Sequence, residues 1–210
     1  MVPANGSVRV NENSRPGSAT VTTGLFDQFG PRPCLLMALN RAPTAGPVAP
    51  SSQVLFNPLG CMVSLNDLCD RPPVMADPAS VHEIGGHAVR TIPTPHVPHG
   101  WEAQVLFDES TRTLFCGDLF TRTGEGPALV HDADLIQPAL DAEDLFGATA
   151  LTPATAPTIR RLADLEPRTL ALMHGPAFAG DCRQALLDLA DAYEARLTAS
   201  LDLTDSGASS

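Results

Sequence analysis

Two histidines and an aspartate occupy positions that suit the ligands of a metal site. His99 lies in a loop nineteen residues before Asp118, which follows a predicted strand, and His174 follows the apolar stretch 169–173. Imidazole nitrogens and carboxylate oxygens are ligands that zinc and iron use in proteins. The ends of strands hold such side chains on a rigid framework. The pattern therefore predicts a site for zinc or iron.

Three further residues are candidates to support or complete this site. His96 lies three residues before His99, and we expect it either to orient or replace a ligand or to be an ordinary loop residue. Trp101 either forms a wall of the pocket or belongs to the core. His131, which stands beside two aspartates, is either a replacement ligand or part of a salt bridge in a loop.

The segment from His82 to His87 is similar to the HExxH motif of zinc proteases. Its histidines are five residues apart instead of four, so they would not share one face of a helix. The consecutive glycines Gly85 and Gly86 also disfavour a helix. We therefore interpret the segment as two strands joined by a glycine turn, with both histidines at the surface.

The elements that must position the ligands are predicted from periodicity and turn residues. Two hairpins are expected, with strands at 80–84 and 87–92 and at 102–108 and 113–117. A short helix is expected over 61–68 and a buried strand over 169–173. This alternation of strands and helices predicts an α/β fold in which helices pack on a sheet.

Two longer helices are expected in the C-terminal part of the chain. The first has Thr155 as its N-cap and ends at Pro167. The second has Asp181 as its N-cap and Gln184 at the capping-box position. Its buried stripe is predicted to consist of Leu186, Leu189, Tyr193 and Leu197.

Composition indicates a globular protein of about one domain. The 210 residues carry 24 acidic and 13 basic residues, all of the latter arginine, for a net charge of −11. This excess of acid disfavours nucleic acids and anionic membranes as partners. No apolar stretch is long enough to span a membrane, no signal peptide is recognised, and the five cysteines form no CxxC pair. We expect reduced thiols and a cytoplasmic location.

Three segments are expected along the chain. Residues 1–50 are rich in Gly, Pro, Ser and Thr, show no sustained period and are predicted to be irregular. They carry a net charge of +2, whereas the rest of the chain carries −13. Residues 51–203 are expected to form the folded domain, and 204–210 a disordered tail.

Several short motifs resemble the C-terminal half of the metallo-β-lactamase superfamily, from about 53 to 201. These are Glu83-Ile84-Gly85-Gly86, Thr94-Pro95 before His99, Gly117-Asp118-Leu119-Phe120 and His174-Gly175-Pro176. The stretch PHGWEAQVLF is more similar to the flavodiiron branch and its oxygen-binding diiron relatives than to the hydrolases. The resemblance implies an α/β fold of αββα type. It also implies that His99 binds one metal, His174 binds a second, and Asp118 bridges both and is the catalytic residue.

The chain departs from this superfamily upstream of Val54. The HxHxDH motif, or the HxExD form of the diiron branch, is expected there, yet residues 1–50 contain no histidine and only Glu12 and Asp27 as carboxylates. The N-terminal half of the fold, with its first metal motif, is therefore expected to be missing or replaced. With two protein ligands for each ion, zinc or iron is expected to bind weakly or sub-stoichiometrically.

The resemblance leaves three functions open. The first is a metal-dependent hydrolase-like protein in which a di-metal site activates water for attack on a small molecule, with impaired activity. The alternatives are a diiron oxidoreductase-like domain that binds oxygen or nitric oxide, and a catalytically dead binding domain. An unpaired sheet edge would favour a homodimer.

Overall fold

The structure is a computed structural model that describes residues 55–65, 72–124 and 126–207. The segment 1–50, expected to be irregular and to lack the first metal motif, lies outside these residues. The described strands are β1 Leu55–Phe56, β2 Val74–Met75, β3 His82–Ile84, β4 His87–Pro93, β5 Gln104–Asp108, β6 Thr113–Phe115, β7 Leu129–Val130, β8 Thr169–Ala171 and β9 Ala177–Phe178. The helices are α3 Pro58–Gly60, the π-helical turn Cys61–Leu65, α4 Ile136–Phe146, α5 Thr155–Ala163 and α6 Cys182–Gly207.

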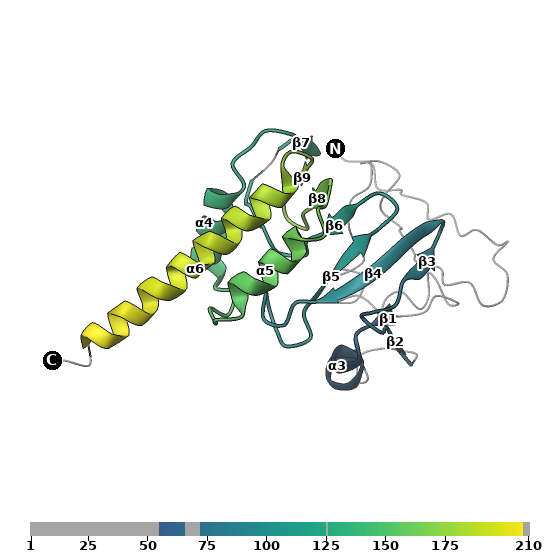
Figure 1. Ribbon diagram of the computed structural model, residues 1–210, viewed down its shortest axis with the longest axis horizontal. Helices are drawn as coiled ribbons and strands as arrows, with labels where there is room; N and C mark the ends of the chain where they lie inside the picture. Colours follow the sequence, from purple (N-terminus) through teal and green to yellow (C-terminus); the bar gives the residue numbers. More distant parts are fainter. Residues whose placement is uncertain (1–54, 66–71, 125, 208–210) are drawn as a thin grey trace, which may run out of the picture.

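The central sheet contains both predicted hairpins (Figure 1). Its strand order in the described part of the chain is β3-β4-β5-β6-β8-β9-β7, and β1 pairs separately with β2. Strands β3 to β6 are antiparallel neighbours, whereas β8 joins β6 in parallel. Gly85 and Gly86 have φ of 59° and 88°, the left-handed backbone that a tight two-residue hairpin turn needs.

The parallel pair β6 and β8 explains how two distant candidate ligands meet. Phe115 and Ala171 are opposite each other in the register. Asp118 lies three residues after Phe115, and His174 lies three residues after Ala171. Since parallel strands point the same way, both side chains emerge at the same edge of the sheet.

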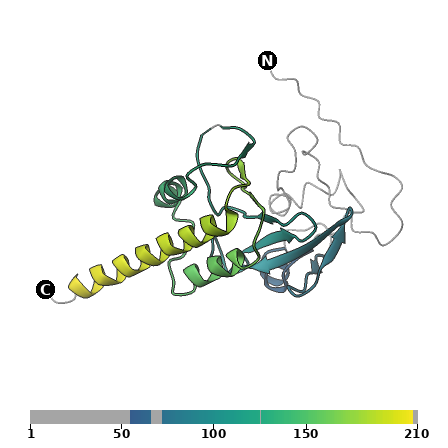
Figure 2. The same ribbon diagram turned by 45° about the horizontal axis from the view of Figure 1, so that its top comes forward.

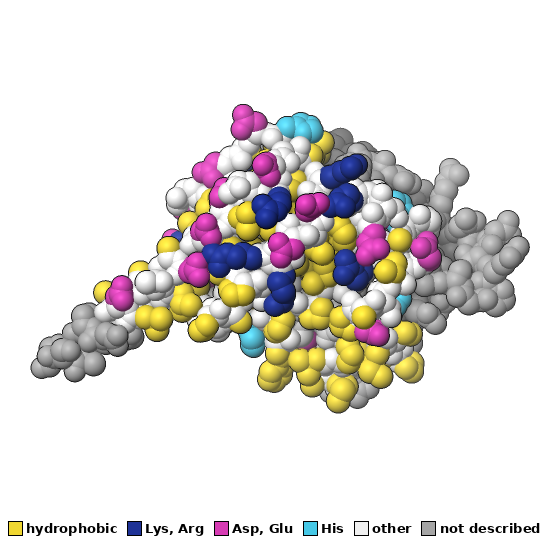
Figure 3. Space-filling model, in the orientation of Figure 1, with side chains coloured by type: hydrophobic (Ala, Val, Ile, Leu, Met, Phe, Trp, Pro, Cys, Tyr) yellow, Lys and Arg dark blue, Asp and Glu magenta, His cyan; other side chains and the backbone are white. Residues whose placement is uncertain are grey.

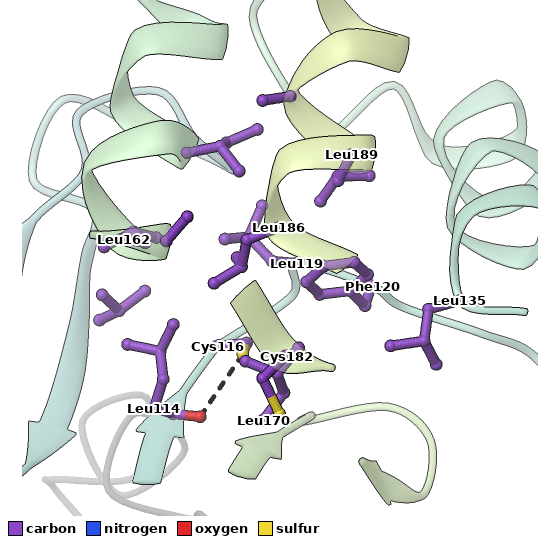
Figure 4. Packing of buried hydrophobic residues seen from close by; sticks show 14 of the residues in the cluster. Leu114, Cys116, Leu119, Phe120, Leu135, Leu162, Leu170, Cys182, Leu186 and Leu189 are labelled. Carbon is purple, nitrogen blue, oxygen red and sulfur yellow. Dashed lines mark hydrogen bonds between the residues drawn. The ribbon is translucent and has the colours of Figure 1, made fainter. Parts of the chain in front are cut away.

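The core lies between the sheet and helices α5 and α6, which run side by side (Figure 2). Leu114 of β6 and Leu170 of β8 face Leu162 of α5 and Leu186 and Leu189 of α6, and all five are fully buried (Figure 4). Burial of a leucine side chain contributes about 1.5–3 kcal/mol. This packing fixes the strands whose ends carry the candidate site.

Helix α6 begins as predicted. The Gln184 backbone N donates to Asp181 Oδ1 over 2.9 Å, which confirms Asp181 as the cap. The Gln184 side chain does not complete a capping box, because it donates to Asp188 instead. The prediction of Thr155 as N-cap of α5 is wrong. Ala154 occupies that position, and the Thr155 hydroxyl donates to Ala150 O within the preceding loop.

Ion pairs attach α6 to its neighbours. Arg160 of α5 pairs with Asp191 and Glu194 over 2.6 and 2.7 Å, and Arg196 pairs with Asp144 of α4 over 2.6 Å. The helix continues to Gly207, so it includes residues 204–207, which were expected to belong to a disordered tail. Its last turns extend beyond the rest of the domain (Figure 1).

Helix α4 and the short strands β7 and β9 were not predicted. The buried residues of α4 are Ala139 and Ala142, so small side chains replace the leucine stripe that would have identified this helix. Its N-cap is Leu135, whose side chain makes no capping hydrogen bond, and Asp134 Oδ1 accepts from the Ile136 and Gln137 backbone N over 2.9 and 3.3 Å instead. Strands of two residues are too short to show a period.

Asn57 connects the β1–α3 segment to the sheet through two hydrogen bonds. Asn57 donates to Gln104 Oε1 over 2.9 Å and to Glu102 O over 2.8 Å. Exposed apolar side chains of α3, the π-helical turn and β2 gather at this end (Figure 3): Leu59, Met62, Val63, Val74 and Met75. None of the helices in the described ranges has the length and apolar character needed to cross a membrane.

Candidate metal centre

His99 is held by a loop that is fixed at both ends. Buried Val97 and Pro98 anchor the loop, and the His99 backbone N donates to Ala148 O over 2.8 Å. In return, Ala150 N donates to His96 O over 3.2 Å. The backbone of His99 is left-handed, with φ of 70°, a conformation that is uncommon outside glycine and is found at functional sites. The loop therefore presents the His99 side chain in one defined direction.

Asp118 lies in the turn that ends β6. Gly117 has φ of 57°, and the Thr121 hydroxyl donates to Asp118 O over 2.7 Å. The Met173 backbone N donates to Gly117 O over 3.1 Å, which ties this turn to the segment after β8. The same segment carries His174, whose carbonyl accepts from the Arg122 backbone N over 2.9 Å. Two backbone hydrogen bonds thus hold the Asp118 and His174 turns together.

The three predicted ligands converge. His99 Nε2 is in contact with Asp118 Oδ2, and His174 Nε2 lies 3.3 Å from Asp118 Oδ1. The two imidazoles therefore face different oxygens of one carboxylate. Their convergence on one site is confirmed, whereas their role as metal ligands stays a prediction.

The donor set suits a divalent cation. Asp118 Oδ1 is buried and makes no hydrogen bond within the part of the chain that the structure describes. A carboxylate oxygen in that state is stabilised by a cation. Two histidines and one carboxylate, on an ion that keeps open coordination positions, form a ligand set used for non-haem iron. A carboxylate with one histidine facing each of its oxygens could also bridge two ions.

The described residues do not make up a complete metal centre. Among the ranges 55–65, 72–124 and 126–207, no group of three or more His, Cys, Asp or Glu side chains has the arrangement of a preformed metal site. Three ligands can hold one ion with open positions, but two ions would need further ligands. As placed in the described structure, the three side chains are therefore at most part of a divalent-metal site.

A pocket of about 910 Å³ opens beside these side chains. His99, Asp118 and His174 line it together with apolar residues from the turn after β6 and from α4. Its volume is within the range of pockets that bind small organic molecules. The remaining lining residues are Phe120, Thr121, Arg122, Thr123, Gly124, Ala139, Ala142, Glu143, Phe146, Gly147, Ala148 and Tyr193.

One wall of the pocket is a hydrogen-bonded group from α4 and α6. The Tyr193 hydroxyl donates to Glu143 Oε2 over 3.0 Å, and the Thr149 backbone N donates to Glu143 Oε1 over 2.8 Å. Burial and the neighbouring Glu143 carboxylate raise the pKa of Tyr193. Tyr193 is therefore a neutral donor that orients Glu143. Tyr193 was predicted only as a core residue, and neither Glu143 nor Arg122 was predicted at all.

The supporting residues lie outside the pocket lining. His96 and Trp101 are exposed and are not among the residues that line the pocket, so their expected roles stay predictions. His131 is exposed, and its Nδ1 lies 3.1 Å from Ala179 O. His87 is exposed at the hairpin surface, as predicted, and its Nδ1 lies 2.8 Å from buried Asp108 Oδ2.

Comparison with known proteins identifies the fold through structure alone. No protein-family model and no curated protein matches the sequence. Among solved structures, the apo state of the chemotaxis sensor ODP from T. denticola matches with a TM-score of 0.50 and 18% identity, over 65% of this chain and 57% of that one. The same sensor has also been solved as a peroxy diiron species.

Flavodiiron proteins match over a similar region. The rubredoxin oxygen:oxidoreductase of the anaerobe Desulfovibrio gigas has a TM-score of 0.55 and 16% identity, over 70% of this chain and 41% of that one. The flavodiiron protein of Giardia intestinalis has a TM-score of 0.51 and 16% identity, over 69% and 36%. This chain thus spans just over half of the sensor and about two fifths or less of the other two. The chain has the mixed α/β, metallo-β-lactamase-like fold that these diiron proteins share.

Proposed function

We propose that this chain is a diiron-type domain that binds a diatomic gas, oxygen or nitric oxide, at a site formed by His99, Asp118 and His174. The proposal rests on one observation: the imidazoles of His99 and His174 both face the Asp118 carboxylate, and an open pocket lies beside them. Iron bound there would supply redox chemistry toward oxygen or nitric oxide. The likeness to the chemotaxis sensor and the flavodiiron proteins supports iron over zinc.

The residues of this chain would have separate tasks at the site. If iron binds, His99, Asp118 and His174 would hold it: the Asp118 carboxylate would compensate part of its charge, and the two histidines would each supply a nitrogen ligand. Phe120, Phe146 and the alanines of α4 would keep the ligand side of the site apolar. Tyr193 would keep the Glu143 carboxylate hydrogen-bonded and turned to one side.

A hydrolase has less support. A hydrolase of this fold needs an ion that lowers the pKa of a bound water toward ~7 and a second group that binds the substrate. The solved structures compared above are diiron sensors and oxidoreductases, and none of those named is a hydrolase. The hydrolase expected from the sequence is therefore not the function we propose.

Anaerobic titration with Fe²⁺ tests the proposal. Calorimetry on the full chain should show iron binding that Asp118→Ala abolishes, and electron paramagnetic resonance after addition of nitric oxide should give a signal in the iron-loaded wild type but not in Asp118→Ala. Asp132→Ala, which changes an exposed aspartate away from the pocket, is the matched control. Iron binding equal in wild type and Asp118→Ala would refute the site, and hydrolysis of a nitrophenyl ester by the zinc-loaded protein would favour a hydrolase.

A further inference from the structure

We infer that the pocket is also a binding site for a small organic anion, in which Arg122 binds a carboxylate or phosphate group and the apolar walls bind the rest of the molecule. This inference goes beyond the proposed gas-binding function and does not depend on bound metal. It follows from the position of Arg122, the state of the charges around it and the size of the pocket.

The stem of Arg122 is fixed beside the candidate ligands. Its backbone N donates to His174 O, and its Cγ and Cδ lie only 3.1 and 3.5 Å from where a Cβ on residue 175 would stand. Gly175 leaves room for this stem and has φ of 137°, which favours glycine. The arginine therefore packs across the turn that carries His174 and lines the pocket.

The charge of Arg122 is not compensated by the residues that the structure describes. Its guanidinium makes no hydrogen bond or ion pair with them, whereas Arg112, Arg160 and Arg196 each bind a carboxylate or carbonyl. Arg122 is also the one arginine among the lining residues in the described ranges. A guanidinium presents a planar set of donors that matches carboxylate and phosphate oxygens.

The acidic groups of the same pocket face residues other than Arg122. Asp118 faces His99 and His174, and Glu143 accepts from Tyr193 and from the Thr149 backbone. In the described structure, neither of these carboxylates forms an ion pair with Arg122. A free oxyanion from a ligand is the partner that would suit the Arg122 guanidinium.

The size and lining of the pocket define the rest of the ligand. A volume of about 910 Å³ is far larger than a diatomic gas needs, since a water molecule takes up about 30 Å³ of liquid. The apolar part of the lining consists of Phe120, Ala139, Ala142, Phe146 and Ala148. An anion with a short apolar body, such as a medium-chain fatty acid or its phosphate analogue, fits this combination of charge and surface.

Octanoate, octyl phosphate and octanol serve as probes, titrated by calorimetry into protein freed of metal and then desalted. Wild type should bind both anions about 10-fold or more tighter than octanol, because a hydrogen bond to a charged group is worth about one tenfold step in affinity or more. Arg122→Met keeps the length of the stem and should lose that preference, while its affinity for octanol stays the same. Arg122→Lys should retain part of the preference, and Arg183→Met, on an exposed face of α6, should behave as wild type.

These titrations test the anion site independently of the proposed iron site. Equal affinity for octanoate and octanol in wild type, or unchanged octanoate binding by folded Arg122→Met, would overturn the anion site. Octanoate binding that requires added metal would also overturn it, because the carboxylate would then be a ligand of the ion. Anion binding without any iron binding would leave the anion site standing and refute the proposed function. Should Arg122→Met not fold, the comparison of anions with octanol on wild type still tests the inference.

Discussion

Replacing Asp108 should destabilise the second hairpin. It should also make the free energy of unfolding of the domain change less as the pH falls. Asp108 is buried at the end of β5, where Oδ1 accepts from Ser110 N over 2.9 Å. Oδ2 lies 2.7 Å from the Thr111 hydroxyl and 2.8 Å from His87 Nδ1. This one carboxylate therefore links the turn between β5 and β6 to the first residue of β4.

The expected loss in the free energy of unfolding follows from these hydrogen bonds. Asp108→Ala removes all of them, but Ser110, Thr111 and His87 are exposed and can bind water instead, so we expect a loss of about 2–3 kcal/mol. Asp108→Asn retains an acceptor for Ser110 and loses the charge, so about 1 kcal/mol is expected. Glu109→Gln is the matched control. Its exposed pair with Arg90, over 3.1 Å, should contribute under about 0.5 kcal/mol.

The contribution of Asp108 to the free energy of unfolding should decrease as the pH falls. Burial alone would raise the pKa of Asp108, but the hydrogen bonds from Thr111, His87 and Ser110 outweigh it and lower the pKa. Its stabilising effect is then fully present above the unfolded pKa of about 3.9 and disappears as the pH falls through the lower folded pKa. The difference in stability between wild type and Asp108→Asn should therefore shrink below about pH 4.

Urea unfolding followed by circular dichroism at pH 7 and at pH 3 measures these differences. A loss below about 0.5 kcal/mol for Asp108→Ala would show that the turn does not depend on this carboxylate. A difference between wild type and Asp108→Asn that is the same at both pH values would refute the assigned direction of the pKa shift.

Three further predictions concern the core and the pocket wall. Leu170→Ala should lower the free energy of unfolding by about 2–5 kcal/mol, whereas Leu145→Ala at a 70% exposed position should change it by under about 0.5 kcal/mol in urea unfolding. Cys116 and Cys182 are buried thiols, and burial raises the pKa of Cys182 to about 11. Both should therefore react with a thiol reagent only after denaturation. Detection of a label on either residue of the native protein by mass spectrometry would contradict the packing. Tyr193→Phe should lose about 1 kcal/mol in thermal melting, and no loss would mean that the bond to Glu143 is not formed in solution.

Much of the sheet could be predicted because its signals are local. Gly85-Gly86 and the four residues between β5 and β6 specify hairpins through turn chemistry, and Asp181 specifies the start of α6. Helix α4 has no apolar stripe, because its buried residues are alanines. Its start does carry a local signal, Asp134, whose Oδ1 accepts from the Ile136 and Gln137 backbone N, and this signal was missed. Thr155 was a reasonable candidate for a cap, but its hydroxyl binds the preceding loop instead.

The candidate site could be predicted only in part. Strand-end positions indicated His99, Asp118 and His174, and the parallel register of β6 and β8 then brings Asp118 and His174 together. The pocket itself could not be predicted, because its wall comes from α4 and α6, far from the ligands in sequence. Arg122 has no motif around it, and only the fold places it across Gly175.

We propose that Asp118 is the residue through which this domain binds metal. The most direct test of this proposal is anaerobic calorimetric titration of Fe²⁺ into wild type, Asp118→Ala and the control Asp132→Ala, with the iron content of each desalted protein measured afterwards. We expect iron in wild type and Asp132→Ala and none in Asp118→Ala, because Asp118 is the one carboxylate among the described residues that faces both histidines. The same iron content in wild type and Asp118→Ala would contradict it.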